Sequence, residues 1–462
     1  MARAKKAAAL TPEERLQAAL VPDWEWPYKL PENWCWTKLG VISAVKGGKR
    51  LPKGRNLLNN KTVHPYIRVT DFDSNSVIIE QVKYIDEETF HYIQNYTISS
   101  KDIYISIAGT IGKVGIIPDS FDGANLTENA AKITDINGIN QKYLLWVLNS
   151  EFAQLQMKDS TISTTQPKLA LFRIENIEIP IPPLAEQQRI VERIESLFAK
   201  LDEAKEKART VLDSFETRKA AIIHKAFTGE LTAKWREAHG VGMESWESVP
   251  LSNVCTVNPK KVDTKNLPDE LEVSFFPMPA LSEIYGEITE PQTRPLKDVR
   301  NGFTNFSEGD VVFAKITPCM ENGKSAVIGK LINGIGFGTT EFFVLRCSDK
   351  LYNRFVYHLV RGKSFRDKAK AVMTGAVGQQ RVPKSFLENY LLHLPEVDEQ
   401  KEIVRILDDF FAKEQQAKEA AEAVLDQIDL MKKSILARAF RGELGTNDPN
   451  DEPAVELLKK ML

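Results

Sequence analysis

The sequence predicts an α+β fold: two mixed α/β domains joined by two long helices that form an antiparallel coiled coil, with the halves related by a pseudo-two-fold internal repeat. Three observations lead to this prediction. The 462-residue chain repeats itself, each repeat ends in a long stretch with coiled-coil spacing, and the rest of each repeat consists of short apolar runs separated by turn residues. A chain of this length also exceeds one ordinary hydrophobic core.

The repeat is clearest where residues 184–231 align with residues 397–444 without a gap, because 21 of those 48 positions carry the same residue. Both segments end alike, with AFTGEL over AFRGEL. Upstream the match weakens but keeps nearly the same offset, so that Trp34 falls on Trp246 and Glu128 falls on Glu341. This pattern indicates that the helices perform one task twice, whereas the diverged globular domains perform two different tasks.

Apolar or small residues in the two aligned segments follow alternating steps of four and three for about five heptads, which is typical of a coiled-coil seam. A helix of ~42 residues would be ~60 Å long, so its predicted role is a spacer. The alternative is a pair of ordinary core helices, but the many charged residues leave only a narrow apolar stripe. The predicted seam residues are Ile194, Leu197, Leu201, Val211, Phe215, Ile222, Leu407, Phe410, Val424, Ile428, Met431 and Ile435.

Arg218 and Glu414 interrupt this seam, one in each helix. If the helices pair antiparallel about a pseudo-two-fold axis, the symmetry carries Glu414 close to Arg218. We therefore expect these two side chains to form one polar layer.

The domains are expected in sequence order. Short β-like runs and a helix near residues 141–157 mark the first globular domain, and similar runs and a helix near residues 353–370 mark the second. A strand is expected over residues 174–181. The expected division is an N-terminal helical extension over 1–30, a first domain over 31–183, a helical region over 184–231, a second domain over 245–396, a second helical region over 397–444 and a C-terminal tail over 445–462.

The N-terminal extension contains a helix-start signal, Thr11-Pro12-Glu13-Glu14, in which threonine caps the helix and proline occupies its first turn. We expect this helix to pack against a partner or against a C-terminal helix near residues 453–462.

Composition excludes several classes of protein. No stretch approaches the ~18–20 apolar residues of a membrane span. The apolar run near the N-terminus is too short for the hydrophobic region of a signal peptide. The four cysteines are scattered and the six histidines show no ligand spacing, so no disulfide framework or metal site is expected, and the cytoplasm is the expected location.

Catalytic signatures are also absent from the sequence. The stretch AGTIGKV at residues 108–114 resembles a phosphate loop only faintly, because its glycines are too close and valine follows the lysine. A tight turn between strands is the expected structure there. Asp102 and Asp310 recur at matching positions and are expected to cap turns before their strands. We therefore expect no catalytic residues in this chain.

Local charge points to nucleic acid, although the net charge of the chain is only −2. Residues 46–55 carry five basic residues and no acid on a glycine-rich turn, and basic residues of this kind can contact a DNA backbone. Before the last strand of each domain, residues 163–168 and 378–384 present glutamine, arginine and lysine, which can contact base edges. Solvated surface loops and polar turns are the alternatives.

The candidate DNA-contacting residues are accordingly drawn from both domains. They are Lys49, Arg50, Lys53, Arg55, Arg68, Lys113, Gln166 and Lys168 in the first domain, and Lys260, Lys261, Lys315, Lys324, Gln379, Gln380, Arg381 and Lys384 in the second.

Two motifs carry a resemblance to a known family. The run IPIPPLAEQQRIV at residues 179–191, the heptads and the run KAFTGELTAKWR at residues 225–236 resemble the first conserved region of a type I restriction-modification specificity subunit. Residues 394–400 and 439–444 resemble the second conserved region. The second segment departs from the first, because it has Pro395-Glu396-Val397-Asp398 in place of Pro-Pro-Leu-Ala, so the two methylase contacts need not be identical.

The resemblance implies two target-recognition domains, each reading one half of a gapped, asymmetric site in double-stranded DNA, with the antiparallel helices fixing the gap. It also implies two methylase subunits and two motor-nuclease subunits as partners. S-adenosylmethionine, ATP and Mg²⁺ would then be bound by those partners and not by this chain. Two other interpretations stay open: an enzyme whose motifs have diverged past recognition, and a coiled-coil adaptor without a sequence-specific DNA role.

Overall fold

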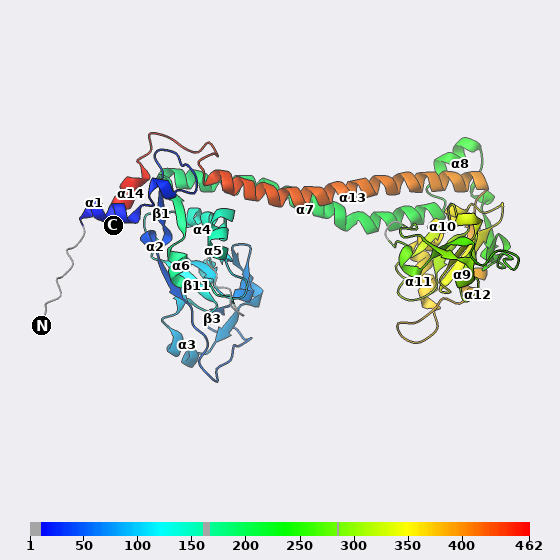
Figure 1. Cartoon of the computed structure of the whole chain (residues 1–462), viewed down its shortest axis with the longest axis horizontal. Helices are drawn as coiled ribbons and strands as arrows, with labels where there is room; N and C mark the ends of the chain where they lie inside the picture. The colour runs from blue at the N-terminus through cyan, green and yellow to red at the C-terminus, as the bar shows by residue number, and fades with distance from the viewer. Residues whose placement is uncertain (1–10, 160–166, 284–285) are drawn as a thin grey trace. The chain divides into compact units, whose positions relative to one another are not determined.

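The computed structural model describes residues 11–159, 167–283 and 286–462, which form two compact units (Figure 1). Unit 1 runs to Lys207 and includes Ala423–Leu462, whereas unit 2 is Ala208–Glu422. Both boundaries fall inside long helices, α7 (Leu184–Phe227) and α13 (Val397–Ala439). Each unit therefore contains one globular domain, the beginning of the helix that follows it and the end of the other helix.

Unit 1 contains two four-stranded sheets and a separate strand pair. The strand order is β6-β3-β10-β7 in one sheet and β2-β11-β8-β9 in the other, and the pair is β1-β12. The strands are β1 (Cys35–Lys38), β2 (Ala44–Gly47), β3 (His64–Ile67), β6 (Lys83–Ile85), β7 (Thr97–Ile98), β8 (Ile103–Ser106), β9 (Val114–Gly115), β10 (Ala124–Leu126), β11 (Ala130–Thr134) and β12 (Glu178–Ile181), with a small hairpin of β4 (Phe72–Asp73) and β5 (Ser76–Val77).

Unit 2 repeats the two sheets and the separate pair, whereas the β4-β5 hairpin belongs to unit 1. Its sheets are β16-β15-β20-β17 and β14-β21-β18-β19, its separate pair is β13-β22, and a parallel pair lies at the same place in both units, β3-β10 and β15-β20. The strands are β13 (Glu247–Pro250), β14 (Cys255–Val257), β15 (Glu272–Phe276), β16 (Gln292–Pro295), β17 (Thr304–Phe306), β18 (Val311–Ala314), β19 (Ser325–Val327), β20 (Gly336–Gly338), β21 (Phe342–Cys347) and β22 (Leu391–Leu394). The internal repeat predicted from the sequence therefore extends through both globular domains.

Shorter helices complete each unit. Unit 1 has α1 (Pro12–Ala19), α2 (Leu39–Ile42), α3 (Glu87–Ile93), α4 (Gln141–Asn149), α5 (Glu151–Asp159), α6 (Leu171–Glu175) and α14 (Ala454–Met461). Unit 2 has α8 (Ala233–His239), α9 (Leu296–Val299), α10 (Asn353–Arg361), α11 (Lys363–Ala371) and α12 (Lys384–Glu388). Within the described residues, no helix is long and apolar enough to cross a membrane.

Three local predictions need correction. The helix expected near 141–157 is broken at Ser150, whose hydroxyl accepts a hydrogen bond from the backbone of Ala153 and so begins a new helix. The helix expected near 353–370 is broken at Gly362, which has extended backbone angles. The strand expected over 174–181 starts only at β12, because Ile174 belongs to α6.

The cores follow the repeat as well. In unit 1 one large cluster joins β1, β8, β11 and β12 to α4, and it includes the fully buried Trp36 and Tyr143. In unit 2 the corresponding cluster joins β14, β18 and β21 to α10, with Phe313 and Phe355 at its centre. The starts of α7 and α13 pack into these cores through Ile190 and Ile403.

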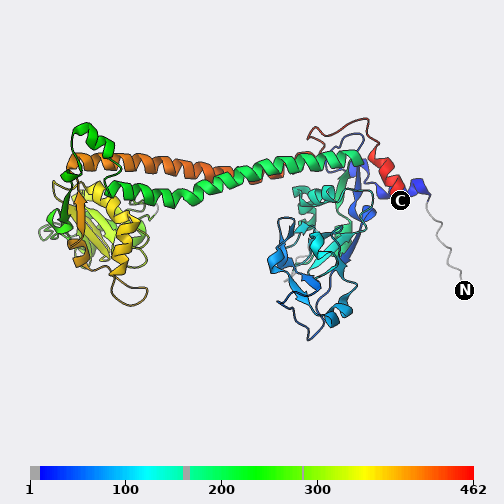
Figure 2. The ribbon, with the colours of Figure 1, turned by 180° about the vertical axis from the view of Figure 1, so that it is seen from behind.

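The two long helices run antiparallel and lie side by side within each unit (Figure 2). In unit 1, Lys205 pairs with Asp429 at 3.1 Å, and Asp202 pairs with Lys432. In unit 2, the guanidinium of Arg218 donates to both carboxylate oxygens of Glu414, at 2.6–3.1 Å. The predicted polar layer of Arg218 and Glu414 is therefore confirmed.

The apolar seam differs from the predicted set at several positions. Val211, Val424 and Met431 are 36%, 39% and 49% exposed, whereas Ala208 and Ala421 are buried. An α-helix has 3.6 residues per turn, so a 3.5-residue repeat drifts around it and only part of each heptad faces the partner helix. The seam is closest to the prediction at the helix starts, where Ile194 and Leu407 are fully buried.

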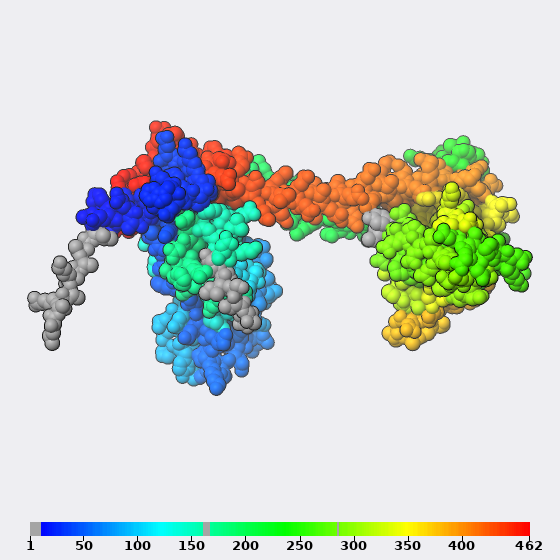
Figure 3. All heavy atoms as spheres, viewed as in Figure 1, coloured from blue at the N-terminus to red at the C-terminus, as the bar shows by residue number. Residues whose placement is uncertain are grey.

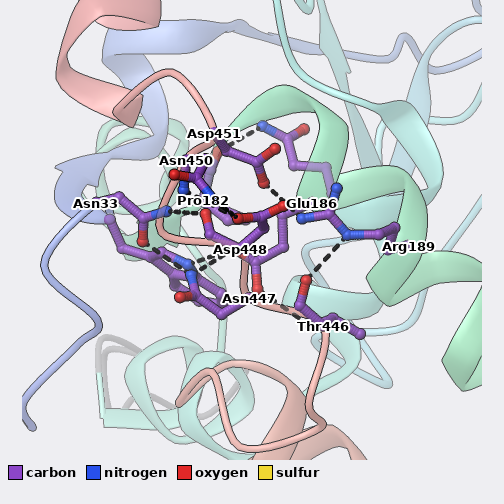
Figure 4. A network of polar contacts seen from close by, with 11 residues as sticks. Asn33, Pro182, Glu186, Arg189, Thr446, Asn447, Asp448, Asn450 and Asp451 are labelled. Carbon is purple, nitrogen blue, oxygen red and sulfur yellow. Dashed lines mark hydrogen bonds and ion pairs between the residues drawn. The ribbon is translucent and has the colours of Figure 1, made fainter.

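The start of α7 is held by a buried carboxylate, Glu186 (Figure 4). The indole of Trp34 donates to Glu186 at 2.7 Å, and Thr446 and Asn447 donate to it at 3.1 Å and 2.9 Å from the segment after α13. Arg189 continues the network by pairing with Asp451. This network fastens the C-terminal tail to the first domain.

The N-terminal extension closes the same unit. Thr11 and Glu14 form a reciprocal capping box at the start of α1, as predicted. Arg15 donates to the backbone oxygen of Leu462 at 2.9 Å, and α1 packs against α14, so the extension and the tail lie together (Figure 3). The expectation that the extension packs against the C-terminal helix is thus confirmed.

The start of α13 is held in the equivalent way by Glu399 in unit 2. The indole of Trp246 donates to Glu399 at 3.0 Å, matching the bond between Trp34 and Glu186. Here the segment after α7 supplies Thr232 and Arg236, each 2.6 Å from Glu399. Arg236 and Glu399 are both buried, so this ion pair is shielded from water.

Candidate nucleic-acid interface

The candidate interface is the loop end of each unit. Four loops meet there at one edge of a four-stranded sheet, which is β2-β11-β8-β9 in unit 1 and β14-β21-β18-β19 in unit 2. We define them in unit 1 as loop A (48–63, after β2), loop B (107–113, after β8), loop C (127–129, between β10 and β11) and loop D (167–170, before α6). Their counterparts in unit 2 are 258–271, 315–324, 339–341 and 372–383.

Backbone hydrogen bonds tie the loops of unit 1 together. Gly48 N donates to Ala130 O at 2.9 Å, Ile107 N donates to Asn129 O at 2.8 Å, and Leu169 N donates to Ile107 O at 2.9 Å. A Cβ atom on Gly48 would lie 2.1 Å from the backbone oxygen of Thr127, so only glycine permits this close approach of loops A and C.

The loops of unit 2 are tied by equivalent bonds. Asn258 N donates to Val344 O at 2.7 Å, Lys315 N donates to Glu341 O at 2.9 Å, and Val382 N donates to Lys315 O at 2.9 Å. The backbone scaffold of the loop end is therefore the same in both units, although the side chains on it differ.

A glutamate in loop C holds an arginine in each unit. In unit 1, Glu128 accepts from Arg50 of loop A at 2.6 Å. In unit 2, Glu341 accepts three hydrogen bonds from Arg381 of loop D, with the closest contact at 2.8 Å. Glu128 is the second residue of loop C and Glu341 is the third, because Ala130 and Phe342 begin the equivalent strands. The sequence alignment of Glu128 with Glu341 is therefore wrong by one residue, and their arginines come from different loops.

In both pairs the arginine lowers the pKa of the carboxyl group. The hydrogen bond from Arg381 lowers the pKa of Glu341. Burial would raise the pKa of Glu128, but the hydrogen bond and charge of Arg50 outweigh burial and lower it. Both carboxylates are therefore ionised at neutral pH and orient guanidinium groups that are open to solvent, since the side chains of Arg50 and Arg381 are 79% and 43% exposed. Arg381 also donates to the backbone oxygen of Gln379 at 3.0 Å.

Lys113 and Lys324 occupy equivalent places in loop B. Their backbone oxygens accept from Ser106 N and Ala314 N, both at 2.9 Å. Their ammonium groups donate to backbone oxygens outside loop B, at 3.3 Å to Phe72 O in the β4-β5 hairpin and at 3.4 Å to Met278 O in the turn after β15. These two predicted residues therefore hold loop B against neighbouring segments as well as lying at the loop end.

Several other predicted residues are already used within the protein. Arg68 forms a two-pronged pair with the buried Asp71, which orients it beside loop C. Arg55 pairs with Glu88, and Lys384 pairs with Glu388 along α12. These ion pairs give each of the three side chains a structural role.

The remaining predicted residues are distributed over the loops. Lys315 of loop B lies 5.7 Å from the ring centroid of Phe343, and Lys49 of loop A lies 5.3 Å from that of Tyr96. The backbone of Gln380 accepts from Thr317 at 3.0 Å, which fixes the base of loop D in unit 2. Exposed residues on loops A and D are Lys53, Lys168, Lys260, Lys261 and Gln379, whereas Gln166 lies outside the described residues.

The structure also shows what sequence reasoning missed. The carboxylates that orient the exposed arginines, Glu128 and Glu341, were absent from the predicted set, although each is the single acidic residue of its loop C. Asp102 and Asp310 cap turns as expected, accepting from Ser99 N at 2.9 Å and from Ser307 N at 2.8 Å. No cluster of three or more metal-ligating side chains occurs in the part of the chain that the structure describes.

The geometry defines a duplicated recognition protein, in which one scaffold presents two different sets of basic and amide side chains. The family model for the type I restriction modification DNA specificity domain matches residues 31–211 and again residues 243–424. The chain belongs to this family. Membership identifies it with the DNA-recognition component of type I restriction-modification systems rather than with a catalytic subunit, as the sequence predicted.

Relatives and solved structures agree with this assignment. The chain is 35% identical over 260 residues to the type I restriction enzyme EcoEI specificity subunit of Escherichia coli, a match that covers 47% of this chain and 43% of that relative. The match therefore spans less than half the length of that relative. Over 428 residues and 90% of each chain, it is 22% identical to the StySPI specificity subunit of Salmonella potsdam.

Two solved structures share the fold. The HsdS subunit from Thermoanaerobacter tengcongensis has a TM-score of 0.62 at 20% identity, covering 91% of this chain and all of that one. A structure reported for the complex assembly and conformational transition of the type I R-M system has a TM-score of 0.65, also at 20% identity, covering 90% of this chain and all of that one. These likenesses support the predicted fold class of two α/β domains with paired long helices.

Proposed function

We propose that this chain selects the DNA sequence on which a type I restriction-modification enzyme acts, with each unit binding one half of a bipartite site through its loop end. The observation that carries the proposal is the loop end itself. The same backbone scaffold is built twice, from equivalent hydrogen bonds, and it presents different side chains in the two units. Such an arrangement suits two different half-sites.

The chemistry of the loop ends suits DNA. Exposed lysines on loops A and D can contact phosphates, which supplies affinity that depends on salt. Arginine held by a carboxylate presents a planar fork of donors in a fixed direction, and such a fork can bind the edge of guanine. We assign this role to Arg50 and Arg381, because each donates to a carboxylate of loop C.

The antiparallel helices are proposed to set the spacing between the two half-sites and to dock the methylase subunits. The two helical regions carry the same residue at 21 of 48 aligned positions, which supports docking on both, because a partner that binds the shared residues of one can bind those of the other. Two methylase and two motor-nuclease subunits are the proposed partners. S-adenosylmethionine, ATP and Mg²⁺ are proposed to belong to those partners, with the assembly in the cytoplasm.

A methylation experiment tests half-site reading. The chain is co-expressed with its methylase subunit, and methylated adenines are located across the genome by single-molecule sequencing. We expect a gapped two-part motif that requires this chain. Arg50→Ala should alter only one half of the motif, Arg381→Ala only the other half, and Lys142→Ala, a 58% exposed residue on α4, should alter neither.

A deletion tests the spacer. Removing residues 205–211 together with 422–428 takes one heptad from each helix and keeps facing residues opposite each other. The loss is ~10 Å of helix, so the unspecified gap in the motif should shorten by about three base pairs. An unchanged gap would contradict the spacer, and an unchanged motif without this chain would favour an adaptor that does not read DNA.

A further inference from the structure

Unit 2 has an apolar groove between the end of α7, the start of α11 and strand β22. The groove encloses about 620 Å³ and is lined by Ile223 and Phe227 of α7, by Ser364 of α11 and by Leu391 and His393 of β22. Leu391 is 62% exposed there, a large value for a leucine on a strand. We call this the α7–β22 groove.

Unit 1 has a groove at the corresponding place, and it is filled. The segment 21–28 of the N-terminal extension lies in it, with the Tyr28 hydroxyl donating to Phe440 O at 3.2 Å. The Tyr28 ring packs edge-on against Trp36 and Phe152, and Arg441 lies 5.1 Å from its centroid. Tyr28 therefore contacts four residues in unit 1, one of which is Phe440 and the others Trp36, Phe152 and Arg441.

The repeat carries these four positions onto the α7–β22 groove. Phe440 and Arg441 correspond to Phe227 and Thr228, and Phe152, the second residue of α5, corresponds to Ser364, the second residue of α11. All three counterparts line the groove. The fourth position, Trp36, corresponds to Ser248, which bonds at 2.9 Å to the lining residue His393.

The backbone hydrogen bonds of the two units also differ, because within the residues that the structure describes a segment covers the outer edge of β1 but not that of β13. In unit 1 the extension adds to the outer edge of β1, through the bridge between Leu20 and Thr37 and a 3.0 Å bond from Val21 N to Trp36 O. In unit 2 the equivalent strand is β13, and among the described residues its one sheet partner is β22. An extended segment can therefore add to the outer edge of β13.

Among the described residues of unit 2, no segment fills this groove. The residues before Trp246 form α8, whose Arg236 is held by Glu399. They thus serve the junction at the start of α13. The counterpart of that junction in unit 1 is made by the C-terminal tail, which leaves the N-terminal extension there to fill the groove.

The occupant of unit 1 indicates the chemistry that fits. Residues 21–28 read VPDWEWPY, with two acids, three aromatic rings and no base. The groove in unit 2 is apolar at its floor and carries Lys363, Lys368, His224 and His393 against Asp367 at its rim. An acidic segment with an aromatic anchor complements both features.

We infer that the α7–β22 groove is a docking site for an extended, acidic peptide segment of a partner protein, which places an aromatic side chain against Phe227 and Leu391. The inference rests on the comparison of the two units and does not require the proposed DNA function.

The test uses the full chain and a fluorescein-labelled peptide with the sequence of residues 20–29. This is the segment that packs at the corresponding place in unit 1. We expect binding with a Kd of about 10–100 μM by fluorescence anisotropy. A photoreactive benzoylphenylalanine at the Tyr28 position should cross-link to residues 220–228 or 391–393. Replacing both acids of the peptide by lysine should weaken binding.

Two variants make the result decisive. Leu391→Asp should weaken binding by about tenfold or more, whereas Ile332→Asp, an exposed apolar residue away from the groove, should leave binding unchanged. Ser364→Phe restores the ring found at position 152 of unit 1 and should tighten binding by about two- to tenfold. A misfolded variant could not give this gain.

Other results would overturn the inference. They are no binding at millimolar peptide, binding that Leu391→Asp leaves unchanged, or cross-links to residues 433–441, which would mean exchange into unit 1. Dimers of the chain that Leu391→Asp abolishes would show that a second copy, and not a partner, covers the groove.

Discussion

Units 1 and 2 share every strand pairing of their two main sheets, yet they complete that fold with different parts of the chain. Unit 1 uses both chain ends: the extension fills its groove, and the tail holds Glu186. Unit 2 uses only an internal segment, α8, which holds Glu399 with a buried arginine. The difference teaches that the same sheets can be completed by different chain segments. The tryptophan–glutamate hydrogen bond at the start of each long helix, by contrast, is present in both units.

The largest expected effect separates the two junctions. Glu399→Gln leaves Arg236 buried without a counter-charge and should destabilise unit 2 by about 3–5 kcal/mol. Glu186→Gln removes a carboxylate bonded to neutral donors and should destabilise unit 1 by about 1–2 kcal/mol. Hydrogen–deuterium exchange of peptides from each unit measures both losses separately. Equal losses would mean that the two junctions are energetically alike.

The next effect concerns the extension. Tyr28→Ala removes a ring that packs against Trp36 and Phe152 and should destabilise unit 1 by about 2 kcal/mol, without changing exchange in unit 2. Trp24→Ala is the matched control, because Trp24 is 85% exposed and should change neither unit. If Tyr28→Ala has no effect, the filled groove contributes nothing to unit 1 and the comparison with unit 2 loses its force.

A similar magnitude is expected for the orienting carboxylates. Glu341→Gln removes the charge that directs Arg381, and Glu128→Gln removes the charge that directs Arg50. Each should weaken binding of the cognate DNA by about 1–2 kcal/mol, measured by anisotropy at fixed salt, with loss confined to one half-site. Because Arg381 donates three hydrogen bonds to Glu341 and Arg50 donates one to Glu128, the Glu341 change should be the larger. Weakening that is uniform over all DNA sequences would contradict a base-reading role.

The smallest effect is a pH dependence confined to unit 2. Burial lowers the pKa of His358, which bonds to Asp408 at 3.0 Å between α10 and α13. The unfolded chain therefore takes up a proton more readily, so the stability of unit 2 should be full above about pH 6.5 and decline as the pH falls below it.

Unit 1 provides the contrast, because it has Lys142 paired with Glu195 at the corresponding helix contact. Its stability should stay level over the same range. The melting temperature of unit 2, followed between pH 7.5 and 5.5, should fall by a few degrees, and His358→Asn should remove the slope. The Asp408 carboxylate, whose pKa is lowered by His358 and Arg354 against the effect of burial, would contribute only at lower pH.

The sequence was most informative where contacts obey a period. Heptad spacing and the repeat together predicted the pair of Arg218 and Glu414, because helix phase fixes which side chains face each other. The loop ends were predicted only as sets of residues. Arg50 and Arg381 reach glutamates at different positions of loop C, and they come from different loops, so no local spacing encodes a contact of this kind.

The helix breaks and the groove were beyond prediction for a related reason. Ser150 and Gly362 interrupt helices whose apolar pattern continues past them, because the pattern records burial and not the backbone angle. The filling of a groove by Tyr28 depends on packing between segments more than 400 residues apart, as its bond to Phe440 shows. A period along the chain carries no information at that separation.

The division of the chain has a consequence for how it folds during synthesis. Unit 2 is one continuous stretch, so all of its residues have been synthesised before residues 423–462 are made. Unit 1 begins first but waits for that last stretch, which supplies Phe440, Thr446 and Asn447 to its core and junction. The domain encoded first is therefore completed last, which reverses the usual vectorial order and leaves its half-built core exposed while the second unit forms.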